Sequence, residues 1–337
     1  NLLLELSGNS LAVTATDLDV TIQCNSAADV KVSGSAAVSA HKLFDIVRLL
    51  PEADIHFKSG SGNWIHINCE RSRFKIASLS KDDFPDIPSL GGQTLTLPAS
   101  ALRYMISRSI FAITQEESRY TLNGALMIIQ PDRMVMVTTD GHRLVLITHA
   151  IEMPGLDEEI RVLVPKKTLV ELSKITAEDI LSVEFGRSEN HLFFQAGDRL
   201  LISRVLTGQF PNYEMVIPRG NHRLVLLNTL DFADALRRVA VMADDQSHAV
   251  RFSISDSQID ISSVSTDYGE ARESLPVIYD GDPLEIGFNA VYLLDFLNAV
   301  DTEQVRLELK DQETQGLLRP EVLEEYDYSY VVMPMKL

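Results

Sequence analysis

The sequence of 337 residues is poor in cysteine, in long apolar runs and in metal-ligand motifs. Its two cysteines, Cys24 and Cys69, exclude a small disulfide scaffold and fit a reducing compartment. No apolar run approaches the ~18 residues that a membrane-spanning helix needs. There is no Cys-x-x-Cys pair and no histidine pair at ligand spacing. The sequence therefore predicts no zinc site and no cofactor.

Basic residues are also scarce, since 30 Lys and Arg stand against 48 Asp and Glu and the net charge is −18. This balance excludes a protein with an entirely basic, nucleic-acid-coated surface. Five windows with helical spacing nevertheless hold nine bases and five acids, and these are 41–50, 99–113, 166–175, 230–243 and 289–300. Such a basic layer can meet phosphates while the acidic remainder repels them. The alternative is that Lys and Arg simply favour helices.

The chain repeats one unit of ~125 residues three times, which is the scale of a domain. A Thr-Asp string recurs at Asp17, Asp140 and Asp267, at spacings of 123 and 127 residues. Phe84-Pro85 and Phe210-Pro211 are 126 residues apart, and the helical patterns recur at matching offsets. We therefore predict three domains, with boundaries at 1–92, 93–219 and 220–337.

Each unit combines two helices with several alternating strands, which predicts an α+β fold. Asp140-Gly141 between two alternating runs predicts a hairpin turn. Stretches rich in Pro and Gly at 85–93 and 218–220 predict interdomain linkers. The first unit lacks a counterpart of the helix at 99–113 and of the strand before it. By comparison with the other repeats, we expect about 25–30 residues of this unit to be missing before Asn1.

Three strings resemble the bacterial DNA sliding clamp family, the beta subunit of DNA polymerase III. They are Thr139–Leu144, Phe210–Tyr213 and the terminal Tyr330–Leu337, and the likeness extends over the whole chain. The resemblance implies three clamp-type domains, each with two helices and antiparallel sheets. Two chains would close head to tail into a six-domain ring around duplex DNA. The expected role is that of a non-catalytic, cytoplasmic processivity factor at the nucleoid.

The resemblance also implies partners and a site that binds them. Expected partners are duplex DNA, a second copy of the chain, and the short linear motifs of DNA polymerases, the clamp loader and repair proteins. No membrane is expected among the partners. The pocket for these motifs would comprise Leu122, Thr139, Gly141, His142, Arg143, Leu144, Pro211, Met215, Val216, Met333, Pro334, Met335 and Leu337. DNA contacts would come from Lys42, Arg48, Arg103, Arg119, Tyr120, Lys166, Lys167 and Arg238. The chain interface would bring Phe74 and Ile76 to Val241 and Met242.

Comparing the repeats separates structure from function. Thr-Asp occurs in all three units, which favours a structural turn or cap. Gly141–Leu144 occurs only in the middle unit, which favours a site, although an ordinary hairpin with a solvated His and Arg is the alternative. The tail, with Met333-Pro334-Met335, is unusually apolar for a chain end. We expect Tyr330–Val332 to continue an edge strand that a peptide could extend, unless the tail only fills its own core.

Two other classes of function are open to the sequence. Asp140 and His142 could belong to a hydrolase triad with a serine. However, there is no Gly-x-Ser-x-Gly elbow, phosphate loop or dinucleotide fingerprint. A repeat-built peptide-binding module without a DNA role is the second alternative.

Overall fold

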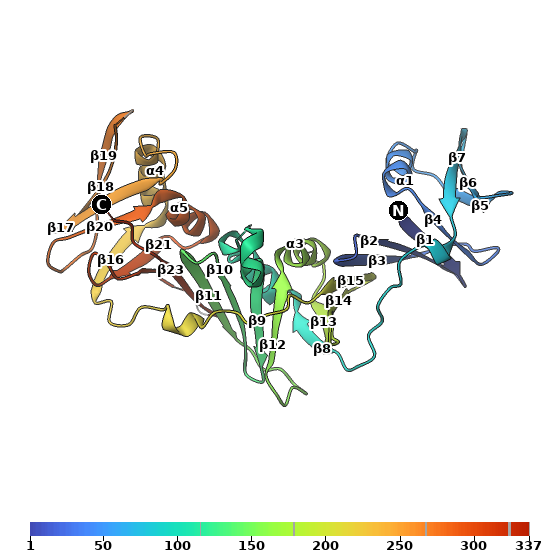
Figure 1. Ribbon diagram of the computed structural model, residues 1–337, viewed down its shortest axis with the longest axis horizontal. Coiled ribbons are helices and arrows are strands. Elements are labelled where there is room, and N and C mark those ends of the chain that lie inside the picture. Colours follow the sequence, from blue (N-terminus) through green and yellow to red (C-terminus); the bar gives the residue numbers. More distant parts are fainter. Residues whose placement is uncertain (115, 178, 267, 323–324, 337) are drawn as a thin grey trace. The chain divides into compact units, whose positions relative to one another are not determined.

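The computed structural model describes residues 1–114, 116–177, 179–266, 268–322 and 325–336 (Figure 1). The chain forms two compact units, of which unit 1 comprises 1–100 and 170–205 and unit 2 comprises 101–169 and 206–337. Two boundaries fall inside the helices α2 (Ala99–Ser107) and α3 (Lys166–Ile175), and the third lies between residues 205 and 206. The central repeat therefore contributes to both units.

Unit 1 is built on one eleven-stranded sheet in which every pairing is antiparallel. Its order is β5 (His56–Ser59), β6 (Trp64–Cys69), β7 (Ser72–Leu79), β4 (Gly34–Val38), β1 (Leu2–Ser7), β2 (Ser10–Thr16), β3 (Val20–Ala27), β15 (Arg199–Arg204), β14 (His191–Ala196), β13 (Ser182–Arg187) and β8 (Leu95–Pro98). Helix α1 (Ala40–Val47) follows β4 and packs Leu43 into an apolar cluster with strand residues such as Val38 and Ile67. A short 3₁₀ helix, η1 (Lys81–Asp83), follows β7.

Unit 2 contains two antiparallel sheets. The larger has the order β12 (Ile160–Pro165), β9 (Gly124–Gln130), β10 (Arg133–Thr139), β11 (Arg143–Ala150), β23 (Tyr326–Val332), β22 (Gly316–Pro320), β21 (Gln304–Leu309) and β16 (Arg223–Asn228). The smaller has the order β19 (Gly269–Pro276), β18 (Gln258–Ser265), β17 (Ala249–Ser255) and β20 (Leu284–Asn289). The helices α4 (Thr229–Ala240) and α5 (Ala290–Ala299) complete it, with the 3₁₀ helices η2 (Ile110–Ala112), η3 (Glu117–Leu122) and η4 (Tyr213–Met215).

The two C-terminal helices begin where an asparagine ends a strand. The side-chain oxygen of Asn228 accepts the backbone N–H of Leu230 at 3.1 Å, and that of Asn289 accepts the N–H of Val291 at 2.9 Å. Each cap satisfies a backbone donor that a helix start leaves free. The same strand–cap–helix junction thus recurs in the repeat.

The α+β class predicted from the sequence is confirmed, because the described residues form five α-helices among antiparallel strands. The predicted Asp140-Gly141 hairpin is also present, with Thr139 opposite Leu144 in register. None of the helices in the described ranges is long and apolar enough to cross a membrane.

The prediction of an edge strand at Tyr330–Val332 is wrong. Strand β23 lies inside the larger sheet, where it pairs with β11 on one side and β22 on the other (Figure 1). Its backbone groups are therefore already hydrogen-bonded, and a peptide cannot extend the sheet there. A strand at the end of a chain need not lie at the edge of a sheet.

Candidate functional site

Thr139 and Asp140 shape the turn that joins β10 to β11. The Thr139 hydroxyl donates to the Arg143 carbonyl at 2.6 Å and accepts the Gly141 N–H at 3.0 Å. Asp140 Oδ1 accepts the backbone N–H groups of His142 at 2.9 Å and Arg143 at 3.1 Å. Gly141 has a φ of +90°, a conformation that glycine adopts without strain.

The first repeat builds the same turn between β2 and β3. The Thr16 hydroxyl donates to the Val20 carbonyl at 3.3 Å, and Asp17 Oδ1 accepts the N–H groups of Asp19 at 3.1 Å and Val20 at 2.9 Å. In these two repeats the Thr-Asp string is therefore a turn motif, which agrees with its structural interpretation. Its third copy includes Asp267, which lies outside the described residues.

The middle repeat differs from the first at three positions of this turn. Gly141 stands where the first repeat has Leu18, which holds a φ of +80°, and His142 and Arg143 stand where it has Asp19 and Val20. Arg143 is only 9% exposed. A hairpin with a solvated arginine is therefore excluded, and the turn of the middle repeat carries a buried cation.

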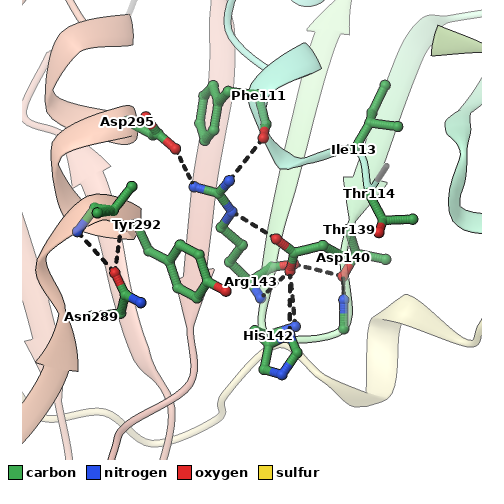
Figure 2. Close-up of polar contacts among 12 residues, drawn as sticks. Phe111, Ile113, Thr114, Thr139, Asp140, His142, Arg143, Asn289, Tyr292 and Asp295 are labelled. Carbon is green, nitrogen blue, oxygen red and sulfur yellow. Dashed lines mark hydrogen bonds and ion pairs between the residues drawn. The ribbon is translucent and has the colours of Figure 1, made fainter. Parts of the chain in front are cut away.

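All three guanidinium nitrogens of Arg143 donate hydrogen bonds to acceptors around the turn (Figure 2). Nε donates to Asp140 Oδ2 at 3.0 Å, Nη1 to Asp295 Oδ2 at 2.6 Å and Nη2 to the Phe111 carbonyl at 2.9 Å. The Arg143 Cζ also lies 4.4 Å from the centre of the Tyr292 ring. Such charge-assisted and cation–π contacts lock the turn to α5 and to η2.

The surroundings of Arg143 keep it charged. Burial opposes the charge, but the Tyr330 hydroxyl and the carboxylates of Asp295 and Asp140 outweigh burial and raise the pKa of the guanidinium. Tyr330 is itself fully buried, which raises the pKa of its phenol, and its hydroxyl donates to the Tyr292 carbonyl at 2.8 Å. Strand β23 and helix α5 therefore both help to hold Arg143, and with it the turn, in place.

A small apolar pocket of about 100 Å³ lies beside the turn. The Met333 N–H donates to the His142 carbonyl at 2.9 Å, so the end of β23 is held next to the turn. The pocket is lined by Leu122, Thr139, Gly141, His142, Arg143, Leu144, Pro211, Tyr213, Val216, Val331 and Met333. An apolar hollow with a few oriented polar groups is suited to an apolar side chain of a partner.

The structure brings together nine of the pocket residues named from the sequence. Three others do not line this pocket: Met215 is 83% exposed, Pro334 lies further along the tail, and the Met335 N–H pairs with the Gly287 carbonyl of β20 at 2.8 Å. Leu337 lies outside the described residues.

Two lining residues, Tyr213 and Val331, were not predicted. Tyr213 ends the Phe-Pro-Asn-Tyr string, so the motif itself carried a signal. Val331 is the cross-strand partner of Leu144, which only the pairing of β23 with β11 reveals.

Several basic residues named as DNA contacts are held by carboxylates. Arg48, directly after α1, lies 3.5 Å from Asp45, and Arg238 Nε on α4 donates to Glu273 at 2.8 Å. That hydrogen bond raises the pKa of Arg238. These cations are partly neutralised within the chain, which weakens their attraction for phosphate.

Two other candidates for DNA contact, Arg119 and Lys166, donate hydrogen bonds to backbone carbonyl groups. Arg119 Nη1 donates to the Asp140 carbonyl at 2.7 Å. Lys166 Nζ donates to the Ile113 carbonyl at 3.3 Å, and burial together with the charge of Arg143 lowers its pKa. The remaining candidates are exposed or half-buried on or next to helices: Lys42, Arg103, Tyr120 and Lys167.

The candidate interface residues differ in exposure. Phe74 and Ile76 alternate on β7; Phe74 is exposed and Ile76 packs partly against the apolar cluster of unit 1. At the end of α4, Val241 is 75% exposed and Met242 is half-buried. Phe74 and Val241 are therefore not core residues of their own units.

The geometry does not support a hydrolase triad at Asp140 and His142. His142 Nδ1 lies 4.0 Å from Asp140 Oδ1, which is beyond hydrogen-bond distance. Both carboxylate oxygens of Asp140 already accept other donors, namely backbone N–H groups and Arg143. Within the described ranges, no group of three potential ligands could hold a metal ion.

Comparisons with known proteins agree along the whole chain. Residues 1–88, 96–212 and 214–336 match the N-terminal, central and C-terminal domains of the DNA polymerase III beta subunit. The beta sliding clamp of Pseudomonas putida is 35% identical over 343 residues, covering 100% of this chain and 92% of its own length. That of Caulobacter vibrioides is 34% identical over 346 residues, covering 100% and 91%.

A solved DNA polymerase sliding clamp from Pseudomonas aeruginosa has the same fold. It superposes with a TM-score of 0.95 at 33% identity and covers 100% of this chain and 92% of its own. The predicted fold class of three clamp-type domains is thereby confirmed. With the repeats, the turn and the matches in agreement, the chain belongs to the beta sliding clamp family, the beta subunit of DNA polymerase III.

Proposed function

We propose that two copies of this chain close head to tail into a ring around duplex DNA and tether the replicative polymerase to its template. The ring would act in the cytoplasm, at the nucleoid, and would catalyse no reaction. Retention would come from topology, so contacts with DNA must remain weak enough for sliding.

The pairing of Arg48 with Asp45 and of Arg238 with Glu273 supports this role. A phosphate must compete with a carboxylate for each of these arginines, which limits the affinity for DNA and leaves it dependent on salt. Contacts of this kind are independent of base sequence. A sliding protein needs both properties.

We further propose that the pocket beside the β10–β11 turn receives short apolar motifs of DNA polymerases, the clamp loader and repair proteins. The single observation that carries this proposal is the buried Arg143, which locks the turn of the middle repeat where the first repeat has Val20. A rigid pocket loses little entropy when a ligand binds. The adaptable side chain of Met333 on its wall suits motifs that differ in shape.

Deletion of residues 333–337 tests the pocket. We expect this variant to lose the binding of a fluorescent peptide that carries the clamp-binding motif of the polymerase catalytic subunit, because Met333 is removed from the wall. Its mass by light scattering should remain that of the intact chain's assembly, since the candidate interface lies elsewhere. Unchanged peptide affinity would refute the pocket assignment.

Griselimycin is bound to solved sliding clamps of Pseudomonas aeruginosa and Bartonella birtlesii. We propose that it enters the pocket beside the β10–β11 turn of this chain, which makes it a second probe. We expect this chain to bind it and a Val216→Arg variant to bind it at least tenfold more weakly. A Met215→Arg variant is the control, because Met215 is exposed and does not line the pocket.

Topology tests the ring. A mass near twice 37.5 kDa that persists on dilution is expected from light scattering. After loading by a clamp loader and ATP, the protein should stay on nicked circular DNA and leave the same DNA once it is linearised. Equal retention on both forms would favour a peptide-binding module without a DNA role.

A further inference from the structure

Unit 1 contains a groove of about 940 Å³ that the proposed function does not use. One wall is the chain that follows β7, from η1 through residues 84–90, which run without helix or strand toward β8 (Figure 1). The floor is formed by side chains of β1, β3, β13, β14 and β15. Its volume lies at the upper end of the range for ligand sites, about 300–1,000 Å³.

The internal repeat relates this groove to the pocket of unit 2. Phe84, Ile87 and Leu90 stand 126 residues before Phe210, Tyr213 and Val216. In unit 2, those three later side chains are half-buried and pack onto the apolar cluster of the large sheet, and Tyr213 and Val216 also line the pocket beside the β10–β11 turn. In unit 1, their counterparts are half-buried as well and line the groove. The same segment of the repeat therefore borders a hollow in both units.

The floor of the groove combines apolar with polar side chains, and its margin is acidic. Leu3 and Phe193 are buried beneath it. The groove is lined by one ammonium group, that of Lys81, and by four carboxylates, those of Glu5, Asp82, Asp86 and Glu184. Lys81 Nζ pairs with Glu5 at 2.6 Å. The other three carboxylates give the lining a net negative charge. Asp82 and Asp86 are exposed at its margin. Such a margin repels nucleic acid and acidic segments and attracts cations.

We propose that this groove is a second peptide site, which binds a short extended segment with one aromatic or branched apolar residue flanked by lysine or arginine. The apolar residue would enter beneath the linker, between Phe84 and the sheet. The basic residues would meet Asp82 and Asp86. This site does not depend on the pocket beside the β10–β11 turn, and its charge selects a different class of partner.

Fluorescence anisotropy with the full chain tests the proposal. The probes are labelled peptides GGKRFKRGG, with leucine, isoleucine or tryptophan also placed at the central position, and their acidic counterparts GGEEFEEGG. Two variants remove the site: Gln23→Trp fills the groove from its floor, and Asp82→Lys with Asp86→Lys reverses the marginal charge. Glu52→Lys with Asp54→Lys is the matched control, because it makes the same change of net charge at exposed residues of unit 1 that do not line the groove.

We expect at least one basic peptide to bind, its acidic counterpart to bind at least tenfold more weakly, and both groove variants to lose at least fivefold while the control changes less than twofold. The Val216→Arg variant, which blocks the other pocket, should bind the basic peptide normally. The proposal is overturned if no basic peptide binds, if the control pair weakens binding as much as the groove pair, or if Val216→Arg abolishes it. Loss of griselimycin binding alone would concern only the other pocket.

Discussion

Replacing Arg143 by methionine tests the idea that a buried cation holds the partner pocket in shape. Methionine keeps part of the volume but removes every guanidinium contact, which leaves Asp140 Oδ2 and the Phe111 carbonyl without this donor. Breaking a buried ion pair by removing one partner costs about 3–5 kcal/mol. Because the Asp295 side chain is 34% exposed and water can solvate it, we expect a loss of about 3 kcal/mol at the lower end of that range.

Hydrogen exchange measures this loss locally, which suits a chain of several domains whose unfolding need not be two-state. The backbone N–H groups of Val145 and Ile147 on β11 report on the turn. A loss of about 3 kcal/mol predicts roughly 100-fold faster exchange at these amides if they exchange through local opening. In Arg143→Lys these amides should exchange faster than in the unmodified chain and more slowly than in Arg143→Met, because one ammonium group cannot reach three acceptors in the geometry of the guanidinium fork.

The matched control is Arg161→Met, which removes an exposed pair with Glu159 at 3.2 Å. Surface pairs contribute about 0–1 kcal/mol, so exchange in β11 should barely change. The reasoning is refuted if Arg143→Met accelerates the exchange of Val145 less than threefold, or if the control has the same effect.

Three further predictions follow from the same contacts. Gly141→Ala should destabilise the β10–β11 turn by about 1–2 kcal/mol in hydrogen exchange, because Gly141 holds a φ of +90° at which a residue with a Cβ is strained. Leu18→Gly should stabilise the matching turn by about 1 kcal/mol, because it relieves the strain of a leucine at a φ of +80°. Glu273→Gln should strengthen binding to short duplex DNA at low salt about two- to threefold, because it frees the charge of Arg238, and unchanged binding would remove Arg238 from the DNA-contacting set. Burial, and to a smaller extent the charge of Arg204, lower the pKa of His191, so the unfolded chain binds a proton at this histidine more readily than the folded chain does. Unit 1 should therefore lose stability as the pH falls below about 6.5, the usual pKa of histidine. His191→Gln should reduce this pH dependence of the stability, as measured by urea unfolding.

Short sequence patterns were sufficient to predict the helices and the turns. Each of the five helical windows covers one of the five helices to within one residue at its start, because apolar spacing and capping residues such as Asn228 act within a few positions. The Asp140-Gly141 turn was predictable for the same reason, and so was the structural role of Asp17. Comparing repeats then identified the position where the middle unit differs, which is where Arg143 lies.

Long-range pairing could not be read from the sequence. Asp295 lies 152 positions from Arg143, and no local rule connects them. The position of β23 within its sheet was predicted wrongly because alternation gives a strand its faces but not its neighbours. That Arg119 and Lys166 donate to backbone carbonyl groups could not be predicted from their charge, and their contact with DNA stays a prediction.

The place of β23 has a consequence for how the protein is made. Strand β23 is synthesised after all the other strands of its eight-stranded sheet, yet it lies in the middle of that sheet and pairs with residues 143–149. During synthesis β11 therefore stays without this neighbour while the chain between the two strands is made. The wall formed by Val331 and Met333 can be completed only after β23 has been synthesised. A chain cut short before β23 would lack this wall of the pocket.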